Sequence, residues 1–560
     1  MKKQPQHVLR AALKLFGLGL LLEILYLALY PLLGNTSGSN AAAKQALLGV
    51  FPWLPHLYWT SWFPSLASLL NAIPIFHQST GAGNGNANLV LVLLGLAFVL
   101  MFIAARIGRR VLRERLSPRN IRLSFWVAIG MTVLFGVTFL IVAGMVSQDV
   151  FLYGLFGRVV TVYHANPYVA NLTAFSSDPL HAGLFKGTQG IAPYGPVWID
   201  LSIPVTLFAH ESVANILIGF RLIGLAAHLA NSVLIWMILT KFKPETRISS
   251  MLLYAWNPLV LLMSISEMHY DAVVVLFILL AVFFLQRNSL TLGWVFLLLA
   301  TLINVLCLLL LPLFLHLLWK ETRAMRWQRR FLWGLSILGV SAVVVALAYA
   351  PYWQGSGGKG IAGILASIGQ AFVQNNSINS LDATIARLSI PLPLFVSWLV
   401  IPQHWTIFPA IAVGVLLLFG LWLADTLELV LLFSSWLFLA LLILLPTNWP
   451  QYVLLPLALA LCAASYRTIL LAMLLTMGAA VEYYFWLWRP TWTAQALVTV
   501  GLPLLLWGWT LFFTSTWEMT HPETEESEQS VKASPSGVLR SWGFSRPSWP
   551  SRPSWPTRSK

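Results

Sequence analysis

The residues in this chain that are best suited to chemistry are acidic side chains beside long apolar stretches. Asp149 follows the apolar stretch 121–146, and aromatic residues and a single arginine, Arg158, come after it. A carboxylate at the end of such a stretch lies near a membrane surface, where it can act on a polar head group that carries a lipid tail. We therefore predict that Asp149 takes part in such chemistry, with a simple polar residue at a span end as the alternative.

A second group of ionisable residues follows the apolar stretch 248–265. Glu267 and Asp271 are four positions apart, so both lie on one helical face if the turn remains helical, and His269 then points elsewhere. Two acids and a histidine can bind a metal ion, but this spacing matches no strong ligand pattern. The alternative is a polar helix end that faces water.

Two turns rich in proline carry aromatic residues. The segment Gly190–Pro196 contains Tyr194 and leads into the apolar segment 194–209, which we expect to be re-entrant or interfacial. The segment Pro446–Tyr452 contains Trp449 and predicts a tight hairpin at the membrane interface. A Pro/Gly boundary and ordinary aromatic anchoring explain the two patterns without a binding role.

The composition identifies the class of protein that must position these residues. The chain has 560 residues, of which 58% are hydrophobic and only 9% are charged, whereas soluble domains carry about 25% charged residues. Many apolar runs exceed the roughly 18–20 residues that span a bilayer. These features predict an all-α polytopic membrane protein. Cys307 and Cys462 both lie in apolar runs, which excludes a disulfide framework.

The apolar pattern predicts about 12–14 transmembrane helices. The fourteen candidate spans are 9–33, 88–107, 121–146, 212–240, 248–265, 270–286, 290–303, 305–319, 331–350, 405–424, 427–445, 451–465, 467–487 and 494–515. The pair 290–303 and 305–319 has one long helix as its alternative. The first run is long and lacks a cleavage signature, so we interpret it as a retained span.

Basic residues predict the orientation. They crowd the N-terminus and the loops around 106–122, 241–247 and 320–330, which all fall on one side. That side is cytoplasmic by the positive-inside rule, so the net charge of +15 reflects topology and predicts no nucleic-acid partner. Both termini are then cytoplasmic. The long outer loops are 34–87, 147–211 and 351–404, and we expect amphipathic helices in them.

The chain divides into a membrane domain, 1–515, and a tail, 516–560. The tail is rich in Pro, Ser, Arg and Trp without apolar periodicity, which predicts disorder on the cytoplasmic side. Most ionisable groups of interest in the membrane domain gather at the outer interface. Ion-coupled transporters tend to place such groups at the bilayer midplane, so this distribution favours surface chemistry. A transporter or flippase of lipid-linked saccharides and a non-catalytic scaffold are the alternatives.

Several short motifs, all on the outer side, resemble one family in their order along the chain. They are Asp149, Gly157-Arg158, Asn166-Pro167-Tyr168, Tyr194-Gly195-Pro196, Trp256-Asn257-Pro258-Leu259, Glu267 and His269-Tyr270-Asp271. Over roughly residues 120–490 the chain resembles GT-C glycosyltransferases, most closely the bacterial polyprenyl-phosphomannose-dependent α-mannosyltransferases. It differs from related proteins at Asn304, where a lysine is common, and at Cys307, which replaces a proline.

The resemblance implies a GT-C-type helical bundle in the cell membrane, with its active site on the extracytoplasmic face. It implies transfer of a hexose, with mannose favoured, from a polyprenyl-phosphate donor in the lipid bilayer to a lipid-linked or cell-envelope glycan acceptor. Asp149 is then the catalytic base. Metal-dependent members use more acids near this position, so we expect no cofactor, with a divalent metal as the alternative.

The remaining site residues follow from the needs of this reaction. Cations near the leaving phosphate are expected among the outer bases Arg158, Lys186, Lys359, Arg387 and Arg489. Aromatic rings that stack on sugar faces are expected at Tyr153, Tyr168, Tyr194 and Trp449. The motifs add Asn166, Glu267, His269 and Asp271 as substrate-binding residues.

The orientation can be tested by cysteine labelling. An impermeant reagent applied from the outer side should modify a cysteine introduced by Ser176→Cys and spare one introduced by Ser117→Cys, because the two positions lie in a base-poor and a base-rich loop. Reversed labelling would move every predicted site residue to the opposite side of the membrane.

Overall fold

The fold is helical throughout the residues described by the computed structural model. These are residues 5–33, 40–72, 87–113, 118–353, 359–370, 379–381, 384–385, 393, 397–398, 401–488 and 495–520. All regular secondary structure in these ranges is helical. Residues Met1–Leu505 form one compact unit, which contains the site, and Leu506–Lys560 form a second. The prediction of an all-α polytopic membrane protein is confirmed. The predicted tail lies outside the described residues from 521 onwards.

Eight described helical stretches are long and apolar enough to cross a membrane. They are α1 (Pro5–Leu33), α5 (Ala87–Arg113), α6 (Pro118–Ile141), α9 (Val213–Phe242), the stretch Val305–Ala324 around α14 (Leu311–Glu321), α15 (Trp327–Trp353), α21 (Leu427–Leu444) and α23 (Tyr466–Trp488). A bent pair, Arg247–Ala255 and Pro258–Ser266, would make a ninth.

The other five predicted spans are shorter apolar helices. They are α12 (Asp271–Gln286), α13 (Leu290–Thr301), α20 (Ile407–Leu423), the stretch Pro450–Ala463 that ends in α22 (Leu454–Ala463), and Leu497–Phe512 at the start of α24 (Leu502–Thr520). A helix of twelve residues such as α13 is about 18 Å long, less than the roughly 30 Å of a hydrocarbon core. The pair 290–303 and 305–319 remains two helices, because Asn304 accepts a hydrogen bond from the Leu306 N–H at 3.0 Å and starts a new turn.

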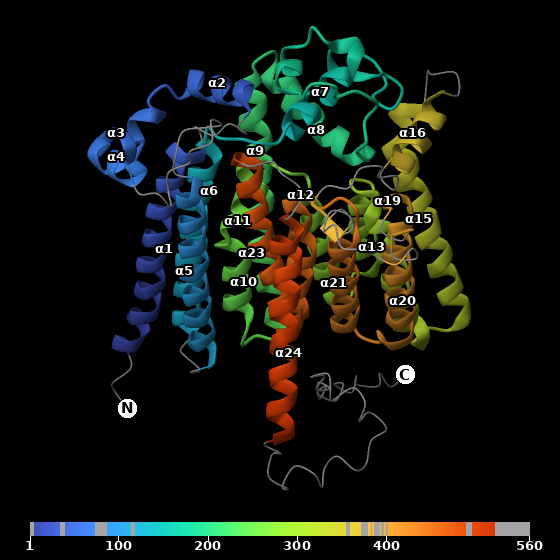
Figure 1. Cartoon of the computed structure of the whole chain (residues 1–560). Helices are drawn as coiled ribbons and strands as arrows, with labels where there is room; N and C mark the ends of the chain where they lie inside the picture. The colour runs from blue at the N-terminus through green and yellow to red at the C-terminus, as the bar shows by residue number, and fades with distance from the viewer. Residues whose placement is uncertain are drawn as a thin grey trace. The chain divides into compact units, whose positions relative to one another are not determined.

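Two short helices between α6 and α9 lie at one end of the long helices of the first unit (Figure 1). They are α7 (Asp149–Thr161) and α8 (Pro196–Ala209), which pack against each other and on α9. Asp149 occupies the first turn of α7, where a negative charge is favourable, and Pro196 occupies the first turn of α8. Helices also form in the other two long loops: α2 (Ala41–Val50), α3 (Trp59–Trp62), α4 (Pro64–Ala72) and α16 (Lys359–Gln370).

The Trp256-Asn257-Pro258 motif produces a bend of 53° between α10 (Arg247–Ala255) and α11 (Pro258–Leu261). The Asn257 side chain accepts hydrogen bonds from the N–H groups of Leu259 and Val260, which caps the new helix. The Trp256 indole donates to the Ala128 carbonyl at 3.2 Å. The motif therefore redirects the chain towards Glu267 and His269.

The helix α6 ends five residues before the predicted end of its span. Residues 142–146 continue as a buried, non-helical link to α7. A side chain at Gly144 would lie 2.5 Å from the Leu33 carbonyl oxygen, so the link approaches α1 closely there. The expectation that Asp149 directly follows a spanning helix is therefore wrong: it begins a separate helix after an extended link.

Candidate active site

Asp149 and His269, which are 120 positions apart, form a hydrogen-bonded pair. Oδ2 of Asp149 lies 3.0 Å from Nδ1 of His269, so a protonated Nδ1 donates to the carboxylate. The His269 side chain is 2% exposed, whereas that of Asp149 is 26% exposed. The pair thus consists of a buried imidazole that holds an accessible carboxylate.

The chain conformation between Glu267 and Asp271 makes this pair possible. The π-helix Leu262–Ser266 ends there, and Met268 has a left-handed backbone with φ of +49°. Glu267 and Asp271 therefore do not share a continuous helical face, and His269 does not point away from the acids. The shared helical face and the separate direction of His269 were both expected for a continuous helix. The helix instead breaks after Ser266, so neither expectation holds.

Glu267 is buried and binds the polypeptide backbone. Its carboxylate accepts hydrogen bonds from the N–H groups of Val146, at 3.0 and 3.1 Å, and of Ser147, at 2.9 Å. The Tyr483 hydroxyl donates to the same carboxylate at 2.6 Å. Glu267 is 1% exposed. These contacts fix the link before Asp149 and give Glu267 a positioning role, while its predicted contact with substrate remains a prediction.

Arg221 of α9 completes the attachment of the link. Its guanidinium donates to the carbonyl of Ser266 at 2.9 Å and to those of Leu140 and Val142 at 2.8 and 2.7 Å. The side chain is fully buried. Gly224, one turn further along α9, allows close contact, since a Cβ there would lie 2.0 Å from the Ser264 carbonyl oxygen. Arg221 was missed in the sequence, although a lone arginine inside the apolar run 212–240 is the signal that marks it.

Asp271 begins α12 beside a cluster of aromatic rings. The ring of Tyr194 lies 5.1 Å from that of Tyr153 and 5.6 Å from that of Tyr270. Burial first, and then the nearby charges of Asp149 and Asp271, raise the pKa of Tyr194 well above its ordinary value. This tyrosine therefore keeps its proton, and both negative charges act on its hydroxyl. Tyr153 and Tyr194 are predicted site residues that the structure places at the acids.

Two tyrosines at the site were not predicted as binding residues. Tyr270 lies between His269 and Asp271, and its hydroxyl accepts a hydrogen bond from the Asn304 amide at 3.4 Å. Tyr452 is close enough to Asp271 and Asp149 for both charges to act on its hydroxyl. The predicted residue Trp449 is half-buried just before the short helix Pro450–Val453 that carries Tyr452.

Asn166 and Tyr168 hold the segment between α7 and α8. The Asn166 side-chain oxygen accepts from the Tyr168 N–H at 3.0 Å, and its amide donates to the Tyr352 carbonyl. The Tyr168 hydroxyl donates to the Tyr194 carbonyl at 2.9 Å. The Asn-Pro-Tyr motif thus fixes the backbone at Tyr194. The predicted contact of Asn166 and Tyr168 with a sugar remains a prediction.

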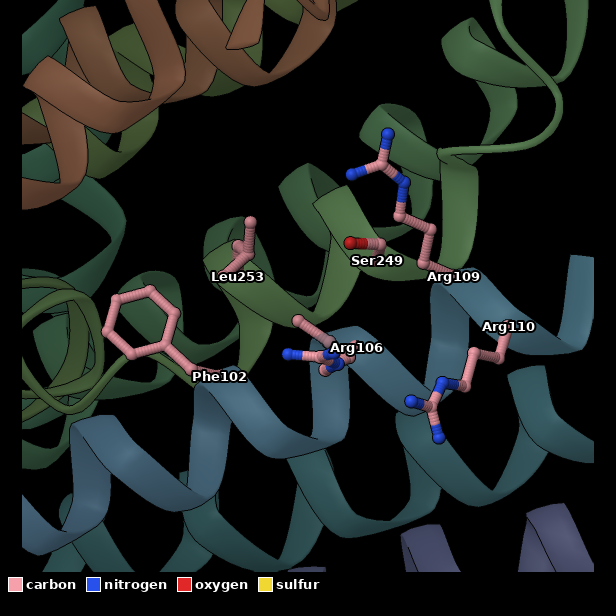
Figure 2. A pocket seen from close by; sticks show the side chains of 7 residues that line it. Phe102, Arg106, Arg109, Arg110, Ser249 and Leu253 are labelled. Atoms are coloured by element: carbon pink, nitrogen blue, oxygen red, sulfur yellow. The ribbon is translucent and has the colours of Figure 1, made fainter. Parts of the chain in front are cut away.

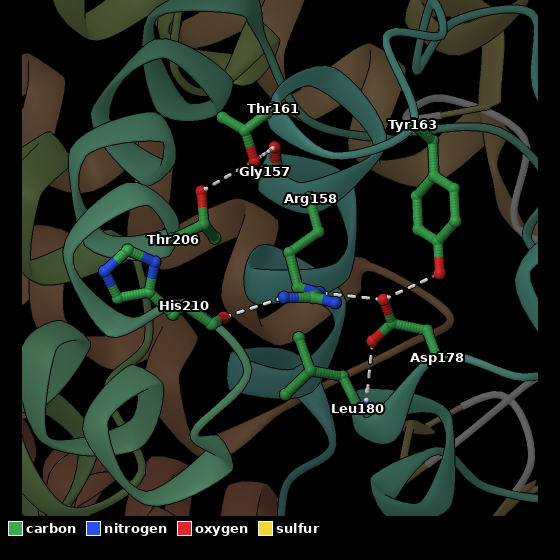
Figure 3. Close-up of polar contacts among 8 residues, drawn as sticks. All are labelled: Gly157, Arg158, Thr161, Tyr163, Asp178, Leu180, Thr206 and His210. Atoms are coloured by element: carbon green, nitrogen blue, oxygen red, sulfur yellow. Dashed lines mark hydrogen bonds and ion pairs between the residues drawn. The ribbon is translucent and has the colours of Figure 1, made fainter.

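Arg158 lies in a buried ion pair inside the segment 147–211 (Figure 3). Its Nε is 2.7 Å from Oδ2 of Asp178, and its guanidinium also donates to the His210 carbonyl at 2.7 Å. Tyr163 and the Leu180 N–H complete the hydrogen bonds to Asp178. Removing one partner of such a pair costs about 3–5 kcal/mol. An alanine at Arg158 would therefore disturb the fold as well as any contact with donor phosphate.

The other predicted phosphate ligands lie elsewhere or outside the described residues. Lys359 is exposed at the start of α16, while Arg387 and Arg489 lie outside the described residues. In the part of the chain that the structure describes, no three His, Cys, Asp or Glu side chains are grouped so as to hold a metal ion. The expectation of a metal-free reaction remains a prediction.

The positioning role of Glu267 can be separated from a binding role by kinetics. In Glu267→Gln an amide NH₂ replaces one oxygen that accepts from the link, so Asp149 is held less well. We expect kcat to fall about 10–100-fold, as for other residues that orient a reactive group, with KM for the donor unchanged. Glu211→Gln, which changes an exposed acid at the end of the segment 147–211 in the same way, is the control. A raised KM with normal kcat would instead place Glu267 against substrate.

The Asp149–His269 pair also predicts a pH dependence of stability. Burial lowers the pKa of His269, but the hydrogen bond and charge of Asp149, with the charges of Glu267 and Asp271, raise it above its ordinary value overall. The pair therefore stabilises the fold fully below the unfolded-state pKa of about 6.5, and this contribution is lost as the pH rises through the raised pKa. The difference in melting temperature between the wild type and His269→Asn should shrink towards alkaline pH. A constant difference would show that the pair is neutral.

One region of the chain is similar in sequence to a known protein family. Residues 48–321 match the family model described as alpha-(1->6)-mannopyranosyltransferase, N-terminal domain, and a comparison with curated proteins gave no match. The matched region contains Asp149, Arg221, Glu267, His269 and Asp271, and this match confirms the resemblance to mannosyltransferases. Residues 48–321 of the chain are therefore similar to the N-terminal domain of alpha-(1->6)-mannopyranosyltransferases.

Proposed function

We propose that this protein transfers a mannosyl residue from a polyprenyl-phosphate donor to a hydroxyl of a lipid-linked or cell-envelope glycan, at the extracytoplasmic face. The family match supports mannosyl transfer. The position of the acids at the end of apolar helices supports a donor that is itself held in the bilayer. The sugar is then presented at the membrane surface, where Asp149 lies.

The observation that carries the proposal is the accessible carboxylate of the Asp149–His269 pair. Oδ2 of Asp149 is held at 3.0 Å from the imidazole, and the side chain stays partly exposed. A general base must be held within hydrogen-bond reach of the proton that it removes. In Asp149 the buried histidine holds one carboxylate oxygen, Oδ2, in place. The other oxygen can then accept the proton of the acceptor hydroxyl.

The reaction balances with these residues alone. The acceptor oxygen forms a bond to the anomeric carbon while the bond from that carbon to the donor phosphate oxygen breaks. The phosphate leaves with the electron pair, and the acceptor proton passes to Asp149. His269 holds the carboxylate throughout, and Asp271 with the surrounding tyrosines offers hydrogen bonds to sugar hydroxyls.

The leaving phosphate needs a nearby cation. This cation is Lys359, Arg387 or Arg489. The ion pair of Arg158 with Asp178 makes these three better test positions. An alanine variant at the position that supplies this cation should lower turnover, because the new negative charge develops on the phosphate as it leaves. A lipid-based assay with purified protein also separates transfer from the alternative of lipid-linked saccharide transport.

The central test is Asp149→Asn, which keeps the shape and removes the basicity. We expect a loss in turnover of roughly 10²–10⁴-fold, the usual contribution of acid–base catalysis. Expression should change little, since the amide can still contact His269, and so should the melting temperature at alkaline pH, where the charge of the pair no longer contributes to stability. Turnover is measured with a polyprenyl-phosphate sugar and an acceptor in lipid.

Asp271→Asn in parallel decides between the two carboxylates. Near-normal turnover in Asp149→Asn, together with its loss in Asp271→Asn, would transfer the role of base to Asp271. Glu211→Gln again serves as the control for removal of an acid from the same segment. Unfolding of the Asp149 variant would show that this carboxylate is structural.

A further inference from the structure

A cavity of about 510 Å³ lies between α5 and α10, away from the candidate active site. Three arginines of α5 line it: Arg106, Arg109 and Arg110. Phe102 on α5 and Leu253 on α10 form its apolar part (Figure 2). The cavity thus joins a cationic zone to an apolar zone across two helices.

The cavity lies at the opposite end of α5 from the active site. Near the start of α5, Asn88 accepts a hydrogen bond from Tyr484, the neighbour of the Tyr483 that binds Glu267. Arg106 follows Asn88 by 18 positions, which corresponds to about 27 Å along the helix. This is close to the thickness of a hydrocarbon core, so the cavity opens near the other membrane surface.

The two helices that form the walls of the cavity pack closely beside it. A Cβ at Gly108 would lie 2.8 Å from Cγ2 of Ile248 and 3.1 Å from Cδ1 of Leu252, so α5 and α10 are in close contact beside it. Phe102, Arg106 and Arg109 follow one another at helical spacing and share one face of α5. In Figure 2 the Arg109 side chain extends past Ser249 of α10, whereas that of Arg110 points away from α10.

The positive charge of the cavity is not balanced by the described part of the chain. None of the three arginines forms an ion pair with a described residue, and no carboxylate is among the lining residues. Guanidinium groups bind phosphate through two parallel hydrogen bonds. Phe102 next to them is 37% exposed and offers a surface for an acyl chain.

We propose that this cavity binds the phosphate head group of a bilayer phospholipid, with Arg106 and Arg109 on the phosphate and Phe102 on the tail. This site is separate from the sugar-transfer site and does not depend on the proposed reaction. The arginines favour an anionic head group, and the apolar residues Phe102 and Leu253 favour a ligand that carries an acyl chain. The positive-inside rule alone explains basic residues at this surface, but it requires no cavity between helices.

The test compares two variants that lose the same charge. Arg106→Gln with Arg109→Gln alters the cavity, whereas Arg326→Gln with Arg329→Gln removes two exposed arginines from another basic loop that does not line it. Full-length protein is equilibrated with mixed phosphatidylglycerol and phosphatidylcholine, and the lipid retained is measured by native mass spectrometry. We expect the cavity variant to lose about 30-fold in affinity for phosphatidylglycerol, since each of its two lost basic contacts contributes about 1 kcal/mol. The control variant should keep it.

Three outcomes would overturn the proposal. Equal loss in both double variants would mean that surface charge alone attracts the lipid. Displacement of the lipid by inorganic phosphate at comparable concentration would assign the site to free phosphate. Equal retention by wild type and cavity variant would exclude binding there. A selective loss of long-chain over short-chain phosphatidylglycerol in Phe102→Ala would confirm the contact with the tail.

Discussion

The site depends on one interaction, the attachment of the Glu267 carboxylate to two consecutive backbone N–H groups, of Val146 and Ser147. These groups belong to a buried, non-helical link, where unpaired peptide groups are costly. Arg221 donates hydrogen bonds to the carbonyl groups of Leu140 and Val142, at the start of this link, and to that of Ser266. A buried acid and a buried base thus replace the backbone hydrogen bonds that a continuous helix would have made.

The broken helices are what bring the reactive groups together. The link after α6 ends at Asp149, and the π-helix ends in the turn that carries His269. Because Glu267 joins these two breaks, it sets the 3.0 Å separation between Asp149 and His269. The irregular backbone is therefore tolerated only where charged side chains satisfy it, and the same side chains orient the carboxylate.

The two ends of the bundle carry different chemistry. At one end, acids and tyrosines lie around the Asp149–His269 pair. Two of these tyrosines lie beyond the matched residues 48–321: Tyr483 binds Glu267, and the charges of Asp271 and Asp149 act on Tyr452. At the other end of α5, arginines line a cavity with an apolar wall.

The sequence by itself determined the class, most spans and the identity of the main acids, because apolar length and charge placement are local properties of the chain. It also marked Asp149, His269 and Asp271, through motifs that resemble a family. Their geometry required the tertiary structure. The spacing suggested a continuous helix through Glu267, whereas contacts across 120 positions break that helix and turn His269 towards Asp149. Arg221 and Tyr483 acquire their roles only through those contacts, since a buried charge is placed by partners that lie far away along the chain.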